Sequence, residues 1–138
     1  MSFVLDASVI AKWYNQEAWS DKAVKLKDRY VKQRLRLFEP TLAVYEVCNA
    51  IRKNPQLDEH DAKEACLSVA TLLRDVEETP SPNEASNVLA LARSRELSYY
   101  DASYVHLANN HTAALITADE ELVTKASKIV RVIHLKNL

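Results

Sequence analysis

The sequence predicts an α/β fold, in which helices cover both faces of a parallel sheet. Short apolar segments with strand character alternate with longer segments of helical spacing, and this alternation is typical of strand–helix–strand units. The first short segment, Phe3–Leu5, is apolar throughout, as expected for a strand buried on both faces. The chain has 138 residues, of which 48% are hydrophobic, so it can bury one core, and we expect a single domain over residues 1–138.

The elements follow from apolar spacing and from the residues between the apolar segments. In order, we predict a strand at 3–5, helices at 8–16 and 20–31, an apolar step at 37–38, helices at 42–53 and 58–73, a strand at 75–79, a helix starting at 81, a helix at 100–110, a strand at 113–117, a helix at 119–126 and a strand at 129–133.

Several helix starts carry capping residues. Ser20, Thr41 and Asp58 are candidate N-caps, and Ser81-Pro82-Asn83-Glu84 has the pattern of a capping box with proline at the first helical position. The helix over 42–53 should end at Asn54-Pro55, because the residue before a proline disfavours helical geometry.

Composition excludes several classes of protein. The chain contains no glycine, so it has neither a P-loop nor a dinucleotide-binding fingerprint. No apolar run approaches the ~20 residues of a membrane-spanning helix, and the N-terminal residues do not resemble a secretory signal. Cys48 and Cys66 lack metal-type spacing and lie among apolar residues, which fits core packing in a reducing compartment. We therefore expect a cytoplasmic protein.

Positive charge is concentrated in one segment. The net charge is −1, which argues against nucleic-acid binding over the whole surface. Between Lys22 and Arg36, however, seven basic residues occur within fifteen positions. This run is either the solvated face of a helix or a surface for phosphates, and Lys12 is a further candidate for phosphate contact.

Four acidic residues stand where predicted elements meet or inside a predicted helix. Asp6 and Asp119 follow the strands at 3–5 and 113–117, so both should project from the same edge of the sheet. Glu46 lies within an apolar helix and needs a polar partner if it is buried. Asp101 and Asp119 also have structural interpretations: Ser98 and Asp101 have cap spacing, and Thr117 with Glu120 fits a capping box.

Four carboxylates gathered in one place would repel one another strongly. A divalent cation removes this penalty, and oxygen ligands without a histidine or cysteine cluster suit Mg²⁺ or Mn²⁺ better than zinc. We therefore predict a metal site made of Asp6, Glu46, Asp101 and Asp119.

The chain resembles PIN-domain ribonucleases in four motifs that occur in the expected order: Val4-Leu5-Asp6-Ala7-Ser8-Val9-Ile10-Ala11-Lys12-Trp13, Tyr45-Glu46-Val47-Cys48-Asn49-Ala50-Ile51, Tyr100-Asp101-Ala102-Ser103-Tyr104 and Leu115-Ile116-Thr117-Ala118-Asp119. Within that family the chain is most similar to the VapC-type toxins of toxin–antitoxin pairs. One departure is the absence of glycine from residues 109–112, where asparagine can supply a left-handed turn.

The resemblance implies a three-layer α/β/α sandwich with a short-stranded, mainly parallel central sheet. It also implies Mg²⁺- or Mn²⁺-dependent RNA cleavage that leaves a 5′-phosphate, a small VapB-type antitoxin as partner, and a homodimer. The acidic quartet of the family maps onto Asp6, Glu46, Asp101 and Asp119, and its supporting polar positions map onto Ser8, Asn49 and Thr117.

A second hypothesis is an interaction module with little or no nuclease activity, whose acidic pocket is filled by a partner. Trp13, Tyr14 and Trp19 could then form the groove for the antitoxin, although core packing explains Trp13 better. A receiver domain of a response regulator also has an acidic pocket on a parallel sheet. It would need an acidic pair after the first strand and a phosphoacceptor Asp after a central strand, and the sequence has neither.

Overall fold

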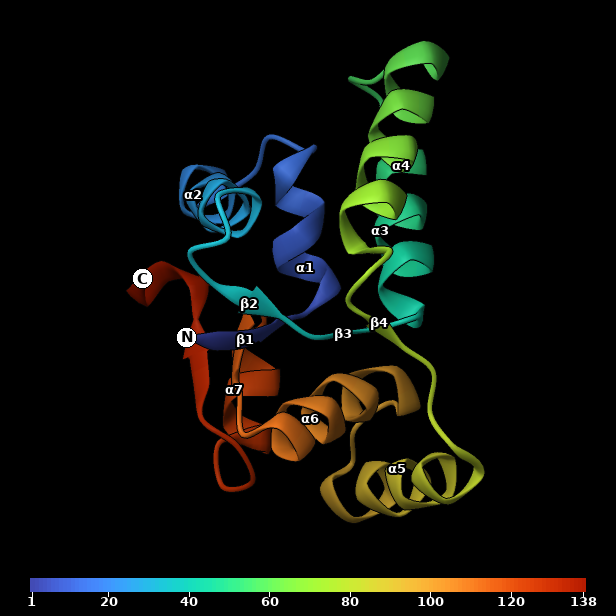
Figure 1. Cartoon of the computed structure of the whole chain (residues 1–138), viewed down its shortest axis with the longest axis vertical. Helices are drawn as coiled ribbons and strands as arrows, with labels where there is room; N and C mark the ends of the chain where they lie inside the picture. The colour runs from blue at the N-terminus through green and yellow to red at the C-terminus, as the bar shows by residue number, and fades with distance from the viewer.

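The computed structural model describes all residues from Met1 to Leu138, which form seven α-helices and six short strands (Figure 1). The strands are β1 (Ser2–Leu5), β2 (Arg36–Leu37), β3 (Glu39–Pro40), β4 (Glu77–Glu78), β5 (Ala114–Thr117) and β6 (Val132–His134). The helices are α1 (Ala7–Ile10), α2 (Ser20–Val31), α3 (Leu42–Arg52), α4 (Glu59–Leu73), α5 (Pro82–Arg95), α6 (Tyr99–His111) and α7 (Glu120–Ala126), with 3₁₀ turns at Ala11–Trp13 and Leu135–Asn137.

Four strands form a central parallel sheet in the order β2-β1-β5-β6. Strands β1 and β5 are neighbours although they are far apart in the sequence, and their register pairs Leu5 with Ile116. Strands β3 and β4 form a separate parallel pair. The predicted α/β class and parallel sheet are therefore confirmed.

Helices cover both faces of the central sheet. Figure 1 shows α1, α2, α3 and α4 on one side and α5, α6 and α7 on the other. The central strands are accordingly apolar on both faces: Val4, Leu5, Leu115 and Ile116 are all 0% exposed. This is the three-layer α/β/α arrangement. No helix is both long enough and apolar enough to cross a membrane.

Three of the predicted helix starts have the expected caps. Asp58 accepts from the N–H of Asp61 at 2.8 Å, and Ser98 accepts from that of Asp101 at 3.0 Å. Ser81 and Glu84 form both hydrogen bonds of the capping box, each at 3.2 Å. These starts depend on local chemistry alone, so they can be predicted from the sequence.

Three other predicted caps are wrong, because their hydroxyl groups form hydrogen bonds elsewhere. Ser20 is the first helical residue of α2 and not its cap; its Oγ donates to the carbonyl of Asn15 and accepts from the N–H of Glu17. Thr41 makes no capping bond, and its hydroxyl pairs with that of Thr79 at 2.9 Å. Thr117 does not cap α7, whose N-cap is Asp119.

Several predicted ends are also wrong. The helix expected to reach Gln16 stops as a 3₁₀ turn at Trp13. The strand expected at 75–79 is only Glu77–Glu78. The last strand begins at Val132, because the N–H groups of Ile129 and Val130 both donate to Ala126 in a turn after α7.

The chain without glycine places four other residues in left-handed geometry: Trp19, Gln33, Glu96 and Thr112. At the end of α6 the left-handed residue is Thr112, with φ of 51°, and not one of the asparagines predicted there. Both Glu96 and Thr112 are C-caps, a position that favours glycine.

Candidate active site

Asp6 lies at the carboxyl end of β1, in the interior of the central sheet. Its N–H donates to the carbonyl of Ile116 on β5 at 3.1 Å. Its side chain caps α1 by accepting from the N–H of Ser8 at 2.9 Å, and only 5% of the residue is exposed. Asp6 is thus held at the edge where open α/β sheets bind ligands.

Two hydroxyl groups hold the carboxylate of Asp6. Ser8 Oγ donates to Asp6 Oδ1 and accepts from the N–H of Ala118 at 3.1 Å. Thr117 Oγ1 donates to Asp6 Oδ2 and accepts from the N–H of Asp119 at 3.0 Å. A hydroxyl has one proton to donate, and a backbone N–H can only donate, so both hydroxyl protons point at the carboxylate.

Glu46 projects from α3 toward α6 and is half-buried. Its Oε1 accepts from the phenol O–H of Tyr104 on α6 at 2.8 Å, and Tyr104 is itself 1% exposed. The polar partner expected for Glu46 is therefore a tyrosine.

Asp101 and Asp119 lie at the starts of helices α6 and α7. Asp101 is in the first turn of α6, and no hydrogen bond to its carboxylate is formed. Asp119 is the N-cap of α7, and its Oδ1 accepts from the N–H of Glu121 at 2.9 Å. Asp119 therefore caps a helix, whereas the Asp101 carboxylate takes no part in the cap at Ser98, and both side chains have carboxylate oxygens free.

Burial and repulsion from neighbouring carboxylates raise the pKa values of Asp6, Glu46 and Asp101. Burial raises the pKa of Asp6 to about 6, although the hydrogen bonds from Ser8 and Thr117 act in the opposite direction. Burial is also the main cause of the raised pKa values of Glu46 and Asp101. The charge of Asp101 adds to the rise at Asp6 and Glu46, and the charge of Asp119 adds to that at Asp101. The charge of Asp101 thus acts on both Asp6 and Glu46.

The side chains are not arranged as a closed chelating cage. No three His, Cys, Asp or Glu side chains lie close enough together to hold a metal ion. The donors nevertheless fit a hard divalent cation, because they are all oxygens and their charges repel one another. Each carboxylate also retains an oxygen lone pair that no protein donor uses.

Sequence reasoning assigned no role to two buried residues of this region, Tyr104 and Glu39. Tyr104 lies three residues after Asp101 on the same helical face, a spacing that could have revealed it. Glu39 is 0% exposed, and its Oε1 accepts from the N–H of Leu5 at 2.7 Å. Its only sequence signal is a single charge between Phe38 and Pro40.

Other predicted residues lie apart from these contacts. Asn49 is exposed, and its Oδ1 accepts from Arg52 Nε at 3.2 Å. Lys12 is 8% exposed, and its ammonium group pairs with Glu17 at 2.9 Å. The basic run from Lys22 to Arg36 covers α2 and the segment that leads into β2. Trp13 is 7% exposed and packs in the core.

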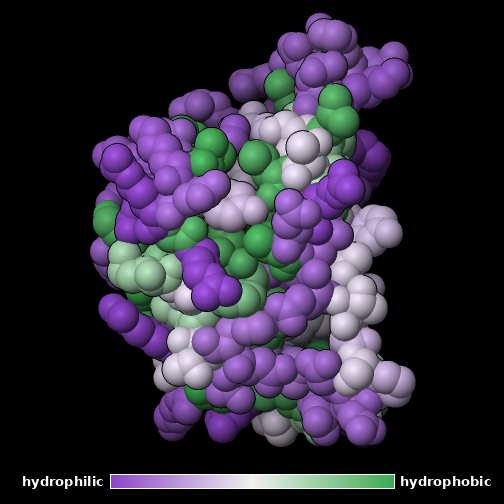
Figure 2. Space-filling view, in the orientation of Figure 1, coloured by the Kyte–Doolittle hydropathy of each residue, from purple (hydrophilic) through white to green (hydrophobic).

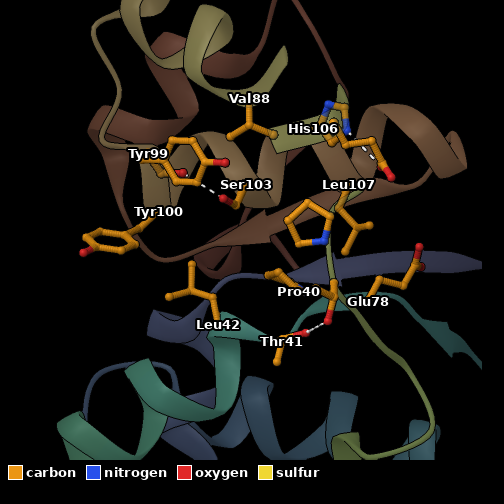
Figure 3. A pocket seen from close by; sticks show the side chains of 13 residues that line it. Pro40, Thr41, Leu42, Glu78, Val88, Tyr99, Tyr100, Ser103, His106 and Leu107 are labelled. Atoms are coloured by element: carbon orange, nitrogen blue, oxygen red, sulfur yellow. Dashed lines mark hydrogen bonds and ion pairs between the residues drawn. The ribbon is translucent and has the colours of Figure 1, made fainter. Parts of the chain in front are cut away.

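A cavity of about 180 Å³ lies where α3, α5 and α6 meet the β3–β4 pair (Figure 3). Leu42 of α3 lines it opposite Tyr99 of α6 and Val88 of α5. Leu42 is one turn before Glu46 on the same helical face, and Tyr100, also in the lining, precedes Asp101. The cavity thus presents apolar side chains of three helices, and none of the four acidic residues lines it.

Comparison with known proteins agrees with this architecture. The family model "PIN domain" matches residues 3–128. Ribonuclease VapC3 of Pyrobaculum aerophilum is 31% identical over 133 residues, which are 94% of this chain and 98% of that protein. Exonuclease VapC9 of the same organism is 31% identical over 105 residues, or 76% of this chain and 78% of that protein.

Solved structures share the fold at lower identity. The crystal structure of PAE2754 from Pyrobaculum aerophilum aligns with a TM-score of 0.72 and 24% identity, covering 99% of this chain and 85% of that one. VapBC2 from Rickettsia felis, solved with a promoter DNA fragment, aligns with a TM-score of 0.66 and 10% identity, covering 97% of this chain and 98% of that one.

Proposed function

This chain belongs to the PIN-domain family and to its VapC-type nucleases, and we propose that it is a metal-dependent endoribonuclease, the toxin of a toxin–antitoxin pair. The observation that carries the proposal is the carboxylate of Asp6, which is fixed at the sheet edge by two hydroxyl protons. Such fixing lowers the reorganisation needed when a cation and a phosphodiester bind there.

The residues of the site have distinct roles in this proposal. Asp6, Glu46, Asp101 and Asp119 would hold Mg²⁺ or Mn²⁺, while Ser8 and Thr117 orient Asp6 and Tyr104 orients Glu46. A bound divalent cation supplies Lewis-acid activation of water and stabilises charge on the phosphate oxygens. Asn49 is retained as a supporting residue from its place one turn after Glu46 on α3.

RNA is the proposed substrate because a curated relative is named a ribonuclease. Exposed basic side chains of the run from Lys22 to Arg36, such as Lys25 and Arg34, are candidates for phosphate contact. Lys12 is a poorer candidate, because Glu17 already pairs with its ammonium group. We place the protein in the cytoplasm, where its two free cysteines would stay reduced.

The test is cleavage of single-stranded and structured RNA by purified protein, with Mn²⁺, with Mg²⁺ or with chelator. We expect cleavage only with metal, and we expect Asp6→Asn to abolish it. Asp28→Asn is the matched control, because Asp28 is an exposed carboxylate of α2 with no hydrogen bond. Full activity of Asp6→Asn would contradict the site assignment.

We also propose a VapB-type antitoxin as the partner. Support comes from the fold shared with VapBC2 and from the surface in Figure 2, where hydrophobic side chains gather between α2 and α4 with hydrophilic side chains on either side. Such a surface suits an amphipathic segment. An antitoxin candidate, co-expressed with the chain, should inhibit RNA cleavage at one equivalent per site.

A homodimer is the proposed assembly. Several large hydrophobic side chains are exposed to solvent; among them, Tyr45 is 72%, Leu67 is 62% and Tyr100 is 58% exposed. Exposed hydrophobic surface of this kind is typical of protein–protein contacts. Light scattering should give twice the chain mass of 15.6 kDa. A monomer at micromolar concentration would contradict this assembly.

An interaction module with little nuclease activity is the second candidate. It is favoured by one observation, that no three acidic side chains are close enough to hold an ion. In that case the protein should bind its partner but show no Mn²⁺ binding by calorimetry, and Asp6→Asn should leave partner binding unchanged. Saturable Mn²⁺ binding that Asp6→Asn abolishes would exclude this candidate.

A further inference from the structure

Glu39 is a buried acidic group to which the proposed chemistry gives no role. The residue is 0% exposed. Its Oε1 accepts from the N–H of Leu5 at 2.7 Å, and its buried Oε2 has no hydrogen-bond partner. Buried carboxyl groups are costly, so one that contacts the residue before Asp6 calls for an explanation.

The path of the chain explains why Leu5 needs this side chain. Residues 36–37 pair with β1, and Phe38 still donates to the carbonyl of Phe3 at 3.0 Å. At the next residue the chain leaves β1: the N–H of Glu39 donates to Val76, at the start of the β3–β4 pair. The N–H of Leu5 therefore finds no backbone acceptor on that side, and the side chain of Glu39 takes the acceptor's place.

This contact lies one residue before Asp6. On the other side of β1, the N–H of Asp6 donates to the carbonyl of Ile116 on β5 at 3.1 Å. The last residues of β1 are thus held from two directions, by Glu39 and by β5. Loss of the Glu39 contact would leave a buried donor unpaired and one side of the strand end unsupported.

The surroundings favour the neutral form of Glu39. No ammonium, guanidinium or imidazole group pairs with it, and burial, together with the charge of Asp6, raises its pKa well above the ordinary value. Glutamine keeps the contact with Leu5, because its amide oxygen can accept from the Leu5 N–H while its amide nitrogen takes the place of Oε2.

We propose that Glu39 is a positioning residue of the acidic site: its carboxyl group replaces the missing strand acceptor for Leu5 and so fixes the end of β1 from which Asp6 projects. The inference rests on the proposed function where it concerns cation binding. The alternative is a charged fifth carboxylate that takes part in cation binding itself.

Two variants separate these roles. Glu39→Gln keeps the acceptor and removes the charge, whereas Glu39→Met keeps the approximate size and removes the acceptor. Each is compared with the wild type by hydrogen exchange of the Leu5 and Asp6 amides, by calorimetric titration with Mn²⁺, and by kcat and KM for RNA cleavage.

We expect Glu39→Gln to retain slow Leu5 exchange and to bind Mn²⁺ within about twofold of the wild type. Glu39→Met should exchange Leu5 rapidly, bind Mn²⁺ about tenfold more weakly, as is usual when a group supporting a metal ligand is lost, and lose kcat with KM for RNA unchanged. Wild-type Mn²⁺ affinity in Glu39→Met, or a tenfold loss in Glu39→Gln, would overturn the inference.

Failure of the proposed function has a different signature. A wild-type protein that neither binds Mn²⁺ nor cleaves RNA contradicts that function. In that case, hydrogen exchange of Leu5 in the two variants still tests whether Glu39 holds the end of β1. If Glu39→Met does not fold, Glu39→Gln is sufficient, because rapid Leu5 exchange or weak Mn²⁺ binding in that variant overturns the inference.

Discussion

At the scale of single residues, the direction of each hydroxyl proton is the most informative feature. Ser8 and Thr117 each accept from a backbone N–H and donate to Asp6. The two accepted N–H groups belong to Ala118 and Asp119, so the same hydroxyls connect the first acidic residue to the segment that carries the last. The orientation of Asp6 therefore depends on side chains that have no charge.

Thr117→Val should weaken cation binding. The variant has nearly the same shape but leaves Asp6 Oδ2 without its donor and the Asp119 N–H without its acceptor. Because the Thr117 hydrogen bond lowers the pKa of Asp6, its loss also lets a proton compete better with the cation. We expect Mn²⁺ affinity to fall about tenfold in calorimetric titrations. Thr117→Ser is the control and should bind as the wild type; unchanged affinity in Thr117→Val would contradict this role.

Asp6→Asn should stabilise the metal-free protein at neutral pH. The pKa of Asp6 is raised from 3.8 to about 6 by burial, so the folded state binds its proton more tightly than the unfolded state. That stabilisation is complete below about pH 4 and is lost as the pH rises through about 6, a difference of about 3 kcal/mol. Asparagine avoids this loss but gives up hydrogen bonds worth about 1–2 kcal/mol.

The expected net gain for Asp6→Asn is therefore about 1–2 kcal/mol at pH 7 in chelator, measured by urea unfolding. At pH 4 the sign should reverse, because the wild-type carboxyl group is then neutral and keeps its hydrogen bonds. A variant that is less stable than the wild type at both pH values would show that burial does not oppose ionisation of Asp6.

The residues of the site differ in how far the sequence could predict them. Asp6 and Asp119 follow strands of a parallel sheet. Their location at the same edge of the sheet can therefore be predicted from the pattern of apolar segments in the sequence. Glu39 could not be predicted, since its role depends on the point at which the chain leaves β1 for β4. The partner of Glu46 is likewise set by the packing of α3 against α6 and not by either helix alone.

At the scale of elements, helix ends without glycine carry local strain. Glu96 and Thr112 are C-caps in left-handed geometry, with φ of 54° and 51°. Threonine is poorly suited to this geometry, because its branched Cβ crowds the neighbouring carbonyl. The turn at Thr112, which connects α6 to β5, thus carries backbone strain that glycine would reduce.

Thr112→Gly should raise the free energy of unfolding by about 1 kcal/mol. This value is the backbone strain that glycine relieves in the folded state, minus the conformational entropy that glycine adds to the unfolded state. The residue is exposed and forms no side-chain hydrogen bond, so Mn²⁺ affinity should not change. Thr124→Gly is the control. Thr124 lies in α7 in ordinary helical geometry, so glycine at this position should lower the free energy of unfolding. Destabilisation of both variants would exclude strain at Thr112.

Helix starts were predictable where the cap is purely local. Asp58 and Ser81 bond only to the turn that they begin, and both predictions are confirmed. The cap predicted at Ser20 is wrong, because its hydroxyl bonds to Asn15 and Glu17 in the loop before the helix. Short strands such as β4 have boundaries set by a partner strand, so apolar pattern alone overestimates their length.

At the scale of the whole molecule, the sheet order brings distant segments to one edge. Strand β1 lies between β2 and β5, and the acidic residues come from β1, α3, α6 and the start of α7. Repulsion among these carboxylates raises the free energy of the folded state but not that of the unfolded state, in which the residues are far apart. A cation that binds the folded state therefore acts on the stability of the whole fold.

Saturating Mn²⁺ should raise the melting temperature of the wild type. At a free concentration of about one hundred times Kd, linkage predicts about 2.7 kcal/mol of added stability. The shift should be absent from Asp6→Asn, while Asp28→Asn should behave as the wild type. Calorimetric scans with Mn²⁺ and with chelator give both values, and an equal shift in Asp6→Asn would place the ion elsewhere.

The pairing of β1 with β5 also has a consequence for the order of events during protein synthesis. Asp6 and Ser8 are synthesised long before Ile116 and Thr117, which supply the acceptor for the Asp6 N–H and the second hydroxyl donor to its carboxylate. Until β5 has been made, Asp6 therefore has Ser8 but lacks the contacts that complete its orientation. If the proposed nuclease activity is correct, a cell translating this message is exposed to the active enzyme only after β5 has been made.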